Sequence, residues 1–93
     1  YDLLISPTLA VTAFEVGRNL PAGPDGQPNP YWACTAAFNL TRHPAVSVPC
    51  GLSSEGLPIG LQISAGHYKD ALVLAAAEAY LAREPFPIPE LPR

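Results

Sequence analysis

The 93-residue sequence contains no methionine, a single lysine and only two cysteines. Because Tyr1 is not a translation start, we expect the chain to be a piece of a longer polypeptide. Basic residues are also scarce, with five Lys and Arg against eight Asp and Glu and a net charge of −3. Binding to nucleic acids rests on neutralising phosphates with clustered basic side chains. We therefore expect no nucleic-acid partner.

Long hydrophobic runs are absent too, since no apolar stretch approaches the roughly 20 residues that a membrane-spanning helix needs. No signal-peptide pattern stands at the start. Cys34 and Cys50 are sixteen positions apart, which fits no metal-ligand spacing. We expect both to be reduced and packed as small apolar side chains, in a cytoplasmic protein without membrane contact, metal or cofactor.

Prolines and apolar runs divide the chain into its elements. Twelve prolines cluster mainly in residues 21–30 and 85–92, which marks irregular connections. Residues 3–5 are apolar at consecutive positions, which is typical of a strand buried on both faces. Residues 46–49 and 59–64 are rich in β-branched side chains and predict a β-hairpin with a loop of about five residues.

Two helices are predicted. Residues 69–84 have an acidic first turn, an alanine-rich interior and a proline directly after them. Residues 31–40 place Trp32, Ala36 and Leu40 on one helical face. Residues 8–16 fit either a strand or a loop. So few elements cannot cover an apolar strand on both faces, so we expect this α/β segment to dock onto a larger sheet.

The residues that suggest an active site fail on inspection. Ser53 resembles the serine of a G-x-S-x-G elbow, but Glu55 stands where the second glycine belongs, and a strand follows instead of a helix. Cys50 has no cationic neighbour in sequence to lower its pKa. His43 and His67 lack a third ligand for a metal. We expect structural roles, with His43 at a strand entry and His67 in a surface link.

The most specific pattern is residues 38–62, FNLTRHPAVSVPCGLSSEGLPIGLQ. Asn39-Leu40-Thr41 before Pro44, then Pro-Cys-Gly-Leu and Gly-Leu-Pro-Ile-Gly-Leu-Gln, resembles the C-terminal block of the amidase signature family, whose members hydrolyse or transfer carboxamides. The resemblance extends from about residue 2 to about residue 80.

The resemblance implies that residues 1–93 are the C-terminal segment of an amidase domain, and not a complete domain. In that family the fold is a large mixed sheet wrapped in helices, and this segment would complete the sheet and form part of the substrate funnel. Family members act through a nucleophilic serine, a second serine and a lysine base. None of these three catalytic residues can be assigned to a position in this sequence, so we expect this chain alone to hydrolyse no amide.

Two departures from the family pattern concern the site. Family members usually have glycine where this chain has Arg42, which points to an unusual backbone angle. The glutamine-handling amidotransferase subunits tend to carry an acidic residue where this chain has Trp32. The resemblance therefore implies that Trp32, with Phe38 behind it, binds the substrate and favours apolar or aryl amides. A role for Trp32 as a plain core residue stays open.

Two other interpretations remain. The chain could be a stand-alone, non-catalytic α/β interaction module, or a fragment of the A subunit of a tRNA-dependent amidotransferase. On the preferred interpretation, its partners are the remainder of the amidase chain and a small-molecule amide. A homo-oligomer is compatible with any of these interpretations.

Overall fold

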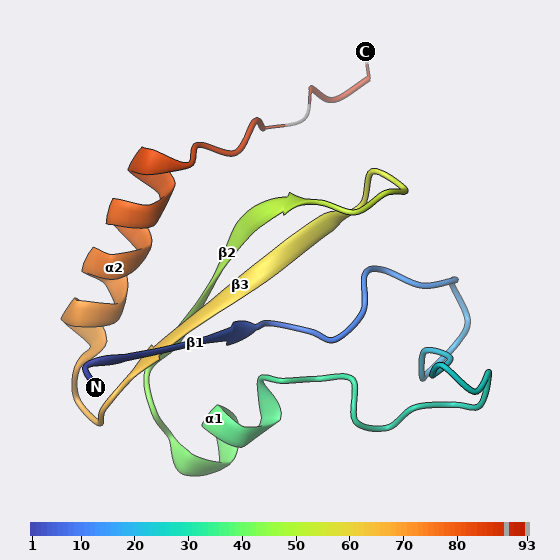
Figure 1. Cartoon of the computed structure of the whole chain (residues 1–93), viewed down its shortest axis with the longest axis horizontal. Helices are drawn as coiled ribbons and strands as arrows, with labels where there is room; N and C mark the ends of the chain where they lie inside the picture. The colour runs from blue at the N-terminus through green and yellow to red at the C-terminus, as the bar shows by residue number, and fades with distance from the viewer. Residues whose placement is uncertain (89, 93) are drawn as a thin grey trace.

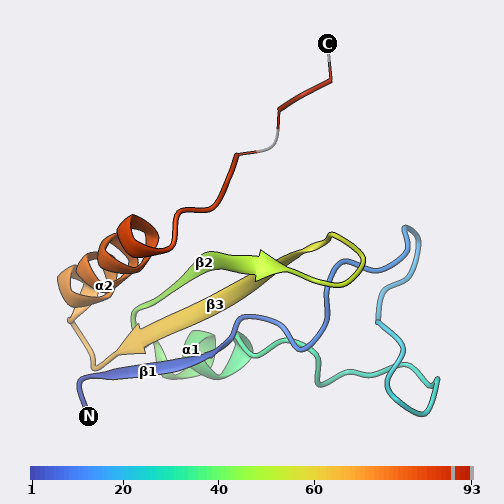
Figure 2. The same cartoon turned by 45° about the horizontal axis from the view of Figure 1, so that its top comes forward.

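The computed structural model describes residues 1–88 and 90–92. Five elements follow one another: strand β1 (Leu3–Pro7), helix α1 (Ala36–Thr41), strands β2 (Ala45–Leu52) and β3 (Pro58–Ala65), and helix α2 (Asp70–Arg83). The strands form one antiparallel sheet in the order β1-β3-β2, with α2 on one side and α1 on the other (Figures 1 and 2). The three predicted strands, their common sheet and the helix at residues 69–84 are confirmed.

The core lies between the sheet and α2. Val48 of β2, Ile63 of β3 and Ala77 of α2 form its buried cluster, and Val73 of α2 is buried as well. These side chains meet because strand residues alternate between two faces, while α2 presents positions 73 and 77 on one side. α2 is the longest helix, and no helix in the described part of the chain is long and apolar enough to cross a bilayer.

The predicted hairpin joins β2 and β3 through the five residues 53–57. The N–H of Ser53 donates to the carbonyl oxygen of Leu57 at 2.8 Å, which closes the loop. Gly56 has φ of 79°, a conformation that glycine adopts without steric cost. The pairing of the strands shifts between Pro49 and Gly51, so Cys50 forms a bulge near the hairpin end.

The helix predicted for residues 31–40 is wrong in its first half, because α1 begins only at Ala36. Upstream of α1 the chain is held in an extended conformation by a distant segment. Ala33 forms an isolated bridge with Leu9, and the N–H of Ala10 donates to the carbonyl oxygen of Trp32 at 2.8 Å. Trp32 therefore lies outside the helix and does not share its face. Residues 8–16 are irregular apart from this bridge.

The proline-rich connection at residues 17–30 extends away from the sheet (Figure 1). It contains a small turn in which Ala22 bridges Pro28 and the N–H of Gly23 donates to the carbonyl oxygen of Gln27. The described residues after α2 have no regular structure. Both predictions of irregular, proline-rich connections are thus confirmed.

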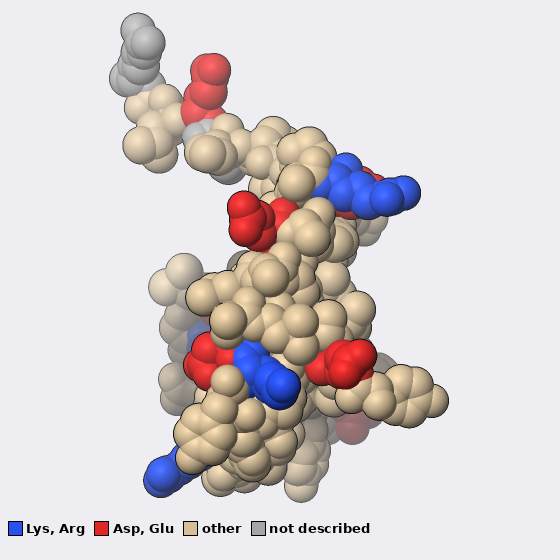
Figure 3. Space-filling view, turned by 90° about the vertical axis from the view of Figure 1, so that its left-hand side faces the viewer, with Lys and Arg blue, Asp and Glu red and all other residues tan. Residues whose placement is uncertain are grey.

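Much apolar surface is left uncovered by this chain. Leu4 and Ile5 of β1 are 58% and 61% exposed, so the expectation that residues 3–5 are buried on both faces is not met within the chain. On the outer side of α2, Leu74 is 65% exposed. Figure 3 shows this flank, where charged side chains are few and scattered between broad uncharged areas. An apolar surface of this kind is typical of an interaction site.

Candidate functional site

Trp32 is half-buried against the segment that follows β1. Its indole ring meets the ring of Phe14 edge-on, with centroids 5.5 Å apart and planes at 90°. This is a favourable geometry for two aromatic rings. Together with the hydrogen bond from Ala10, it ties the two ends of the long connection to each other. Trp32 is thus held in place without being part of the core cluster.

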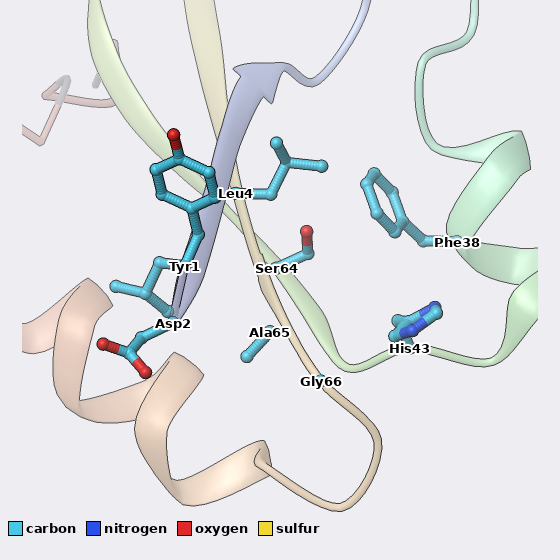
Figure 4. A pocket seen from close by; sticks show the side chains of 9 residues that line it. Tyr1, Asp2, Leu4, Phe38, His43, Ser64, Ala65 and Gly66 are labelled. Atoms are coloured by element: carbon cyan, nitrogen blue, oxygen red, sulfur yellow. The ribbon is translucent and has the colours of Figure 1, made fainter.

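Phe38 projects from α1 toward an open pocket of about 440 Å³ beside the start of β1 (Figure 4). Its ring meets that of His43 edge-on at 6.5 Å. The remaining lining comes from one end of the sheet, where the start of β1 pairs with the end of β3, with Tyr1, Asp2, Leu3, Leu4, Ser64, Ala65 and Gly66. Trp32 does not line this pocket, so the structure places the two candidate residues in different surroundings.

The middle of the sheet face opposite α2 is polar. Gln62 and Ser64 of β3 are both buried there, and register places Ser6 of β1 and Ser47 of β2 on either side of Gln62. Thr8 adds a further hydroxyl, 2.7 Å from that of Ser47. We did not single out these residues in the sequence. In β2 and β3 the alternation contains the signal, because Ser47 and Gln62 each stand between two apolar residues.

The two histidines lie together. The rings of His43 and His67 stack with centroids 4.0 Å apart and planes at 11°. Thr41 connects them: its carbonyl oxygen accepts from Nε2 of His67 at 2.8 Å, and its hydroxyl lies 2.7 Å from Nδ1 of His43. That hydroxyl donates to the carbonyl oxygen of Ala37, so it accepts from His43. The His43–Thr41–His67 contact joins the turn before β2 to the link before α2.

Ser53 and Cys50, the two side chains considered as nucleophiles, make hydrogen bonds within the hairpin. The hydroxyl of Ser53 accepts hydrogen bonds from the N–H groups of Glu55 and Leu57, both at 3.2 Å, as is usual for a turn residue. The thiol of Cys50 donates to the carbonyl oxygen of Ile59. Both cysteines are free. No group of three metal-ligating side chains occurs among the residues that the structure describes.

Arg42 stands where the resemblance implied a glycine. It follows α1 with φ of 60° and ψ of 29°, in the left-handed region. A helix commonly ends in this conformation, and glycine is the usual residue for it. The special backbone angle inferred for this position is therefore present, although the side chain is arginine.

Comparison with solved structures defines the class of protein. A bacterial aryl acylamidase of the amidase signature family superposes on 91% of this chain with a TM-score of 0.77 and 35% identity. A 6-aminohexanoate cyclic dimer hydrolase superposes on 92% of it with a TM-score of 0.66 and 32% identity. The small sheet with its helix is thus a fragment of the fold of these amide-cleaving enzymes.

The sequence comparisons establish the family. The Amidase family model matches residues 1–74, and this chain belongs to the amidase signature family, as residues 38–62 indicated. An acylamidase of Rhodococcus erythropolis is 39% identical over 92% of this chain. The A subunit of a glutamyl-tRNA(Gln) amidotransferase from Brevibacillus brevis is 45% identical over 86% of it. The chain spans less than a fifth of the length of either, 19% and 16% respectively.

Proposed function

We propose that this chain is the C-terminal part of an amide hydrolase that converts a carboxamide to a carboxylate and ammonia or an amine. In that reaction the C–N bond breaks and a water molecule supplies the second oxygen of the carboxylate. One proton of that water goes to the leaving nitrogen and the other to solvent, which leaves the carboxylate ionised. The chain completes the sheet and forms part of the substrate funnel, while the nucleophile and base come from the remainder of the polypeptide. Its two free cysteines suit a cytoplasmic location.

The observation that carries this proposal is the likeness to the bacterial aryl acylamidase, which extends over 91% of the chain at 35% identity. The acylamidase relative points the same way, with 39% identity over 90 residues. A stand-alone interaction module does not account for this likeness, because both matches continue from the sheet through the loops. The uncovered faces of β1 and α2 are the surfaces on which the remaining polypeptide would dock.

A second candidate function is that of the A subunit of an amidotransferase. It is favoured by the Brevibacillus brevis relative, whose 45% identity exceeds that of the acylamidase. The residue at position 32 argues against it. A tryptophan offers a large apolar surface and no carboxylate, so it does not suit the charged backbone of free glutamine.

We assign to Trp32 the role of a substrate wall, with Phe38 lining the neighbouring pocket. Trp32 is only half-buried within this chain. A rigid ring at this place would favour an aryl or apolar acyl group by about 1–3 kcal/mol for a methylene or two of matched surface. That is enough to separate an aryl amide from a small polar one.

The test is Trp32→Ala in the full-length amidase polypeptide, with kcat/KM measured for an aryl amide and for a small polar amide. We expect the aryl amide to lose about tenfold or more, and the polar amide to change little. Tyr31→Ala is the matched control, because Tyr31 is the adjacent aromatic residue and is 89% exposed. An equal loss for both substrates, or no change for either, would make Trp32 a packing residue.

A further inference from the structure

Gln62 is a buried polar residue in the middle of the sheet. It lies on the central strand β3, is only 3% exposed, and points to the face opposite the core residue Ile63. A buried amide is destabilising unless its hydrogen bonds are made. Its partners therefore show why the position is polar, although both sequence neighbours in the strand are apolar.

The side-chain amide of Gln62 connects two elements that are distant in sequence. Its Nε2 donates to the hydroxyl of Ser6 at 3.1 Å and to the carbonyl oxygen of Cys34 at 3.3 Å. A carbonyl oxygen only accepts, so the nitrogen of the amide, and not its oxygen, must face Cys34. One side chain thus links β3 to β1 and to the segment before α1.

The hydrogen bond between Gln62 and Cys34 affects the position of Trp32. Cys34 follows Trp32 by two residues, at the turn that leads into α1. The Leu9–Ala33 bridge and the Ala10 hydrogen bond hold residues 32 and 33 from the other side. Those two contacts attach the segment to the loop after β1. The hydrogen bond from Gln62 attaches the same segment to the sheet. This bond therefore sets the distance between Trp32 and the polar face of the sheet.

We propose that Gln62 is a positioning residue, which fixes the Trp32 segment to the sheet and thereby sets the selectivity of the substrate wall. This inference rests on the proposed function of Trp32. A variant without the amide donor would leave the carbonyl oxygen of Cys34 unpaired. The segment would then be held by the loop after β1, and the ring of Trp32 would become more exposed to solvent.

The first test uses the fluorescence of Trp32, the single tryptophan of residues 1–93, in the full-length amidase polypeptide with tryptophans outside these residues replaced by phenylalanine. In Gln62→Leu, whose side chain is of similar size, we expect a red-shifted emission and stronger quenching by acrylamide. Ser6→Ala is the matched control, because it removes the other partner of the same nitrogen and leaves the Cys34 bond in place. An unchanged spectrum in folded Gln62→Leu, or an equal shift in Ser6→Ala, overturns the proposal.

The second test measures selectivity in the full-length amidase polypeptide. Gln62→Leu should lower the ratio of kcat/KM for an aryl amide over a small polar amide by about fivefold, whereas Ser6→Ala should leave that ratio unchanged. If Trp32→Ala changes the ratio and Gln62→Leu does not, the positioning role is wrong. If Trp32→Ala has no effect on the ratio, the substrate wall itself fails, whatever the fluorescence shows.

A measurement on the unmutated full-length polypeptide covers the case in which Gln62→Leu does not fold. Nuclear Overhauser contacts should connect the side-chain amide protons of Gln62 with the backbone of Cys34 and with the side chain of Ser6. Contacts to Ser6 alone would show that the bond to Cys34 is not made, and would overturn the proposal without any variant.

Discussion

Of the glycines, Gly60 leaves the least room for an added methyl group. It lies in β3 beneath the point where the hydroxyls of Thr8 and Ser47 meet at 2.7 Å, reaching across the central strand from either side. The N–H of Thr8 also donates to the carbonyl oxygen of Gly60 at 3.0 Å. A methyl group added here would stand 2.8 Å from Oγ1 of Thr8, 2.9 Å from Oγ of Ser47 and 3.1 Å from Cβ of Thr8.

We expect Gly60→Ala to reduce the free energy of unfolding by about 0.5–3 kcal/mol. Forcing a methyl group into a filled site typically costs about 1–3 kcal/mol. Separating the two hydroxyls adds about 0.5 kcal/mol, at the low end for a hydrogen bond because this one is exposed. The smaller entropy of an unfolded chain with alanine returns about 0.4–1 kcal/mol.

The measurement is urea unfolding of the purified protein, followed by far-UV circular dichroism. Gly66→Ala is the matched control, since its added methyl would meet nothing nearer than Cγ of Lys69 at 4.0 Å. We expect no loss of stability in this control. Ser47→Ala removes one of the clashing oxygens, so the double variant with Gly60→Ala should lose less than the sum of the two single variants. Equal effects of Gly60→Ala and Gly66→Ala would refute the reasoning.

Two further predictions concern the backbone of Arg42 and the activity of the isolated chain. Because Arg42 has φ of 60°, Arg42→Gly should raise the free energy of unfolding by about 0.5–1 kcal/mol, whereas Arg42→Ala should not; a gain in both would mean that the side chain, and not the backbone angle, is unfavourable. The purified chain should hydrolyse neither aryl nor aliphatic amides by itself, and should restore activity when co-expressed with the preceding amidase polypeptide. Turnover by the chain alone that is lost in Ser53→Ala would contradict this expectation.

Local pattern alone predicted most of the regular elements. The apolar and β-branched runs at residues 3–5, 46–49 and 59–64 became strands, since alternation and β-propensity act within a few residues. The boundaries of α2 are also local, because its acidic first turn and the following Pro85 lie next to it in sequence. The family followed from residues 38–62, whose pattern is specific enough to need no coordinates.

The tertiary structure decided what depends on partners far along the chain. Local propensity favours a helix through Trp32, yet pairing with residues 9 and 10 holds that segment extended. The stack of His43 on His67 joins residues 24 positions apart, and the bond from Gln62 to Cys34 spans 28. Such contacts form only once the strands are in register, since a slip of one residue would turn Gln62 toward the core. The sequence by itself thus determined the elements and the family, and only their packing determined where the candidate site residues stand.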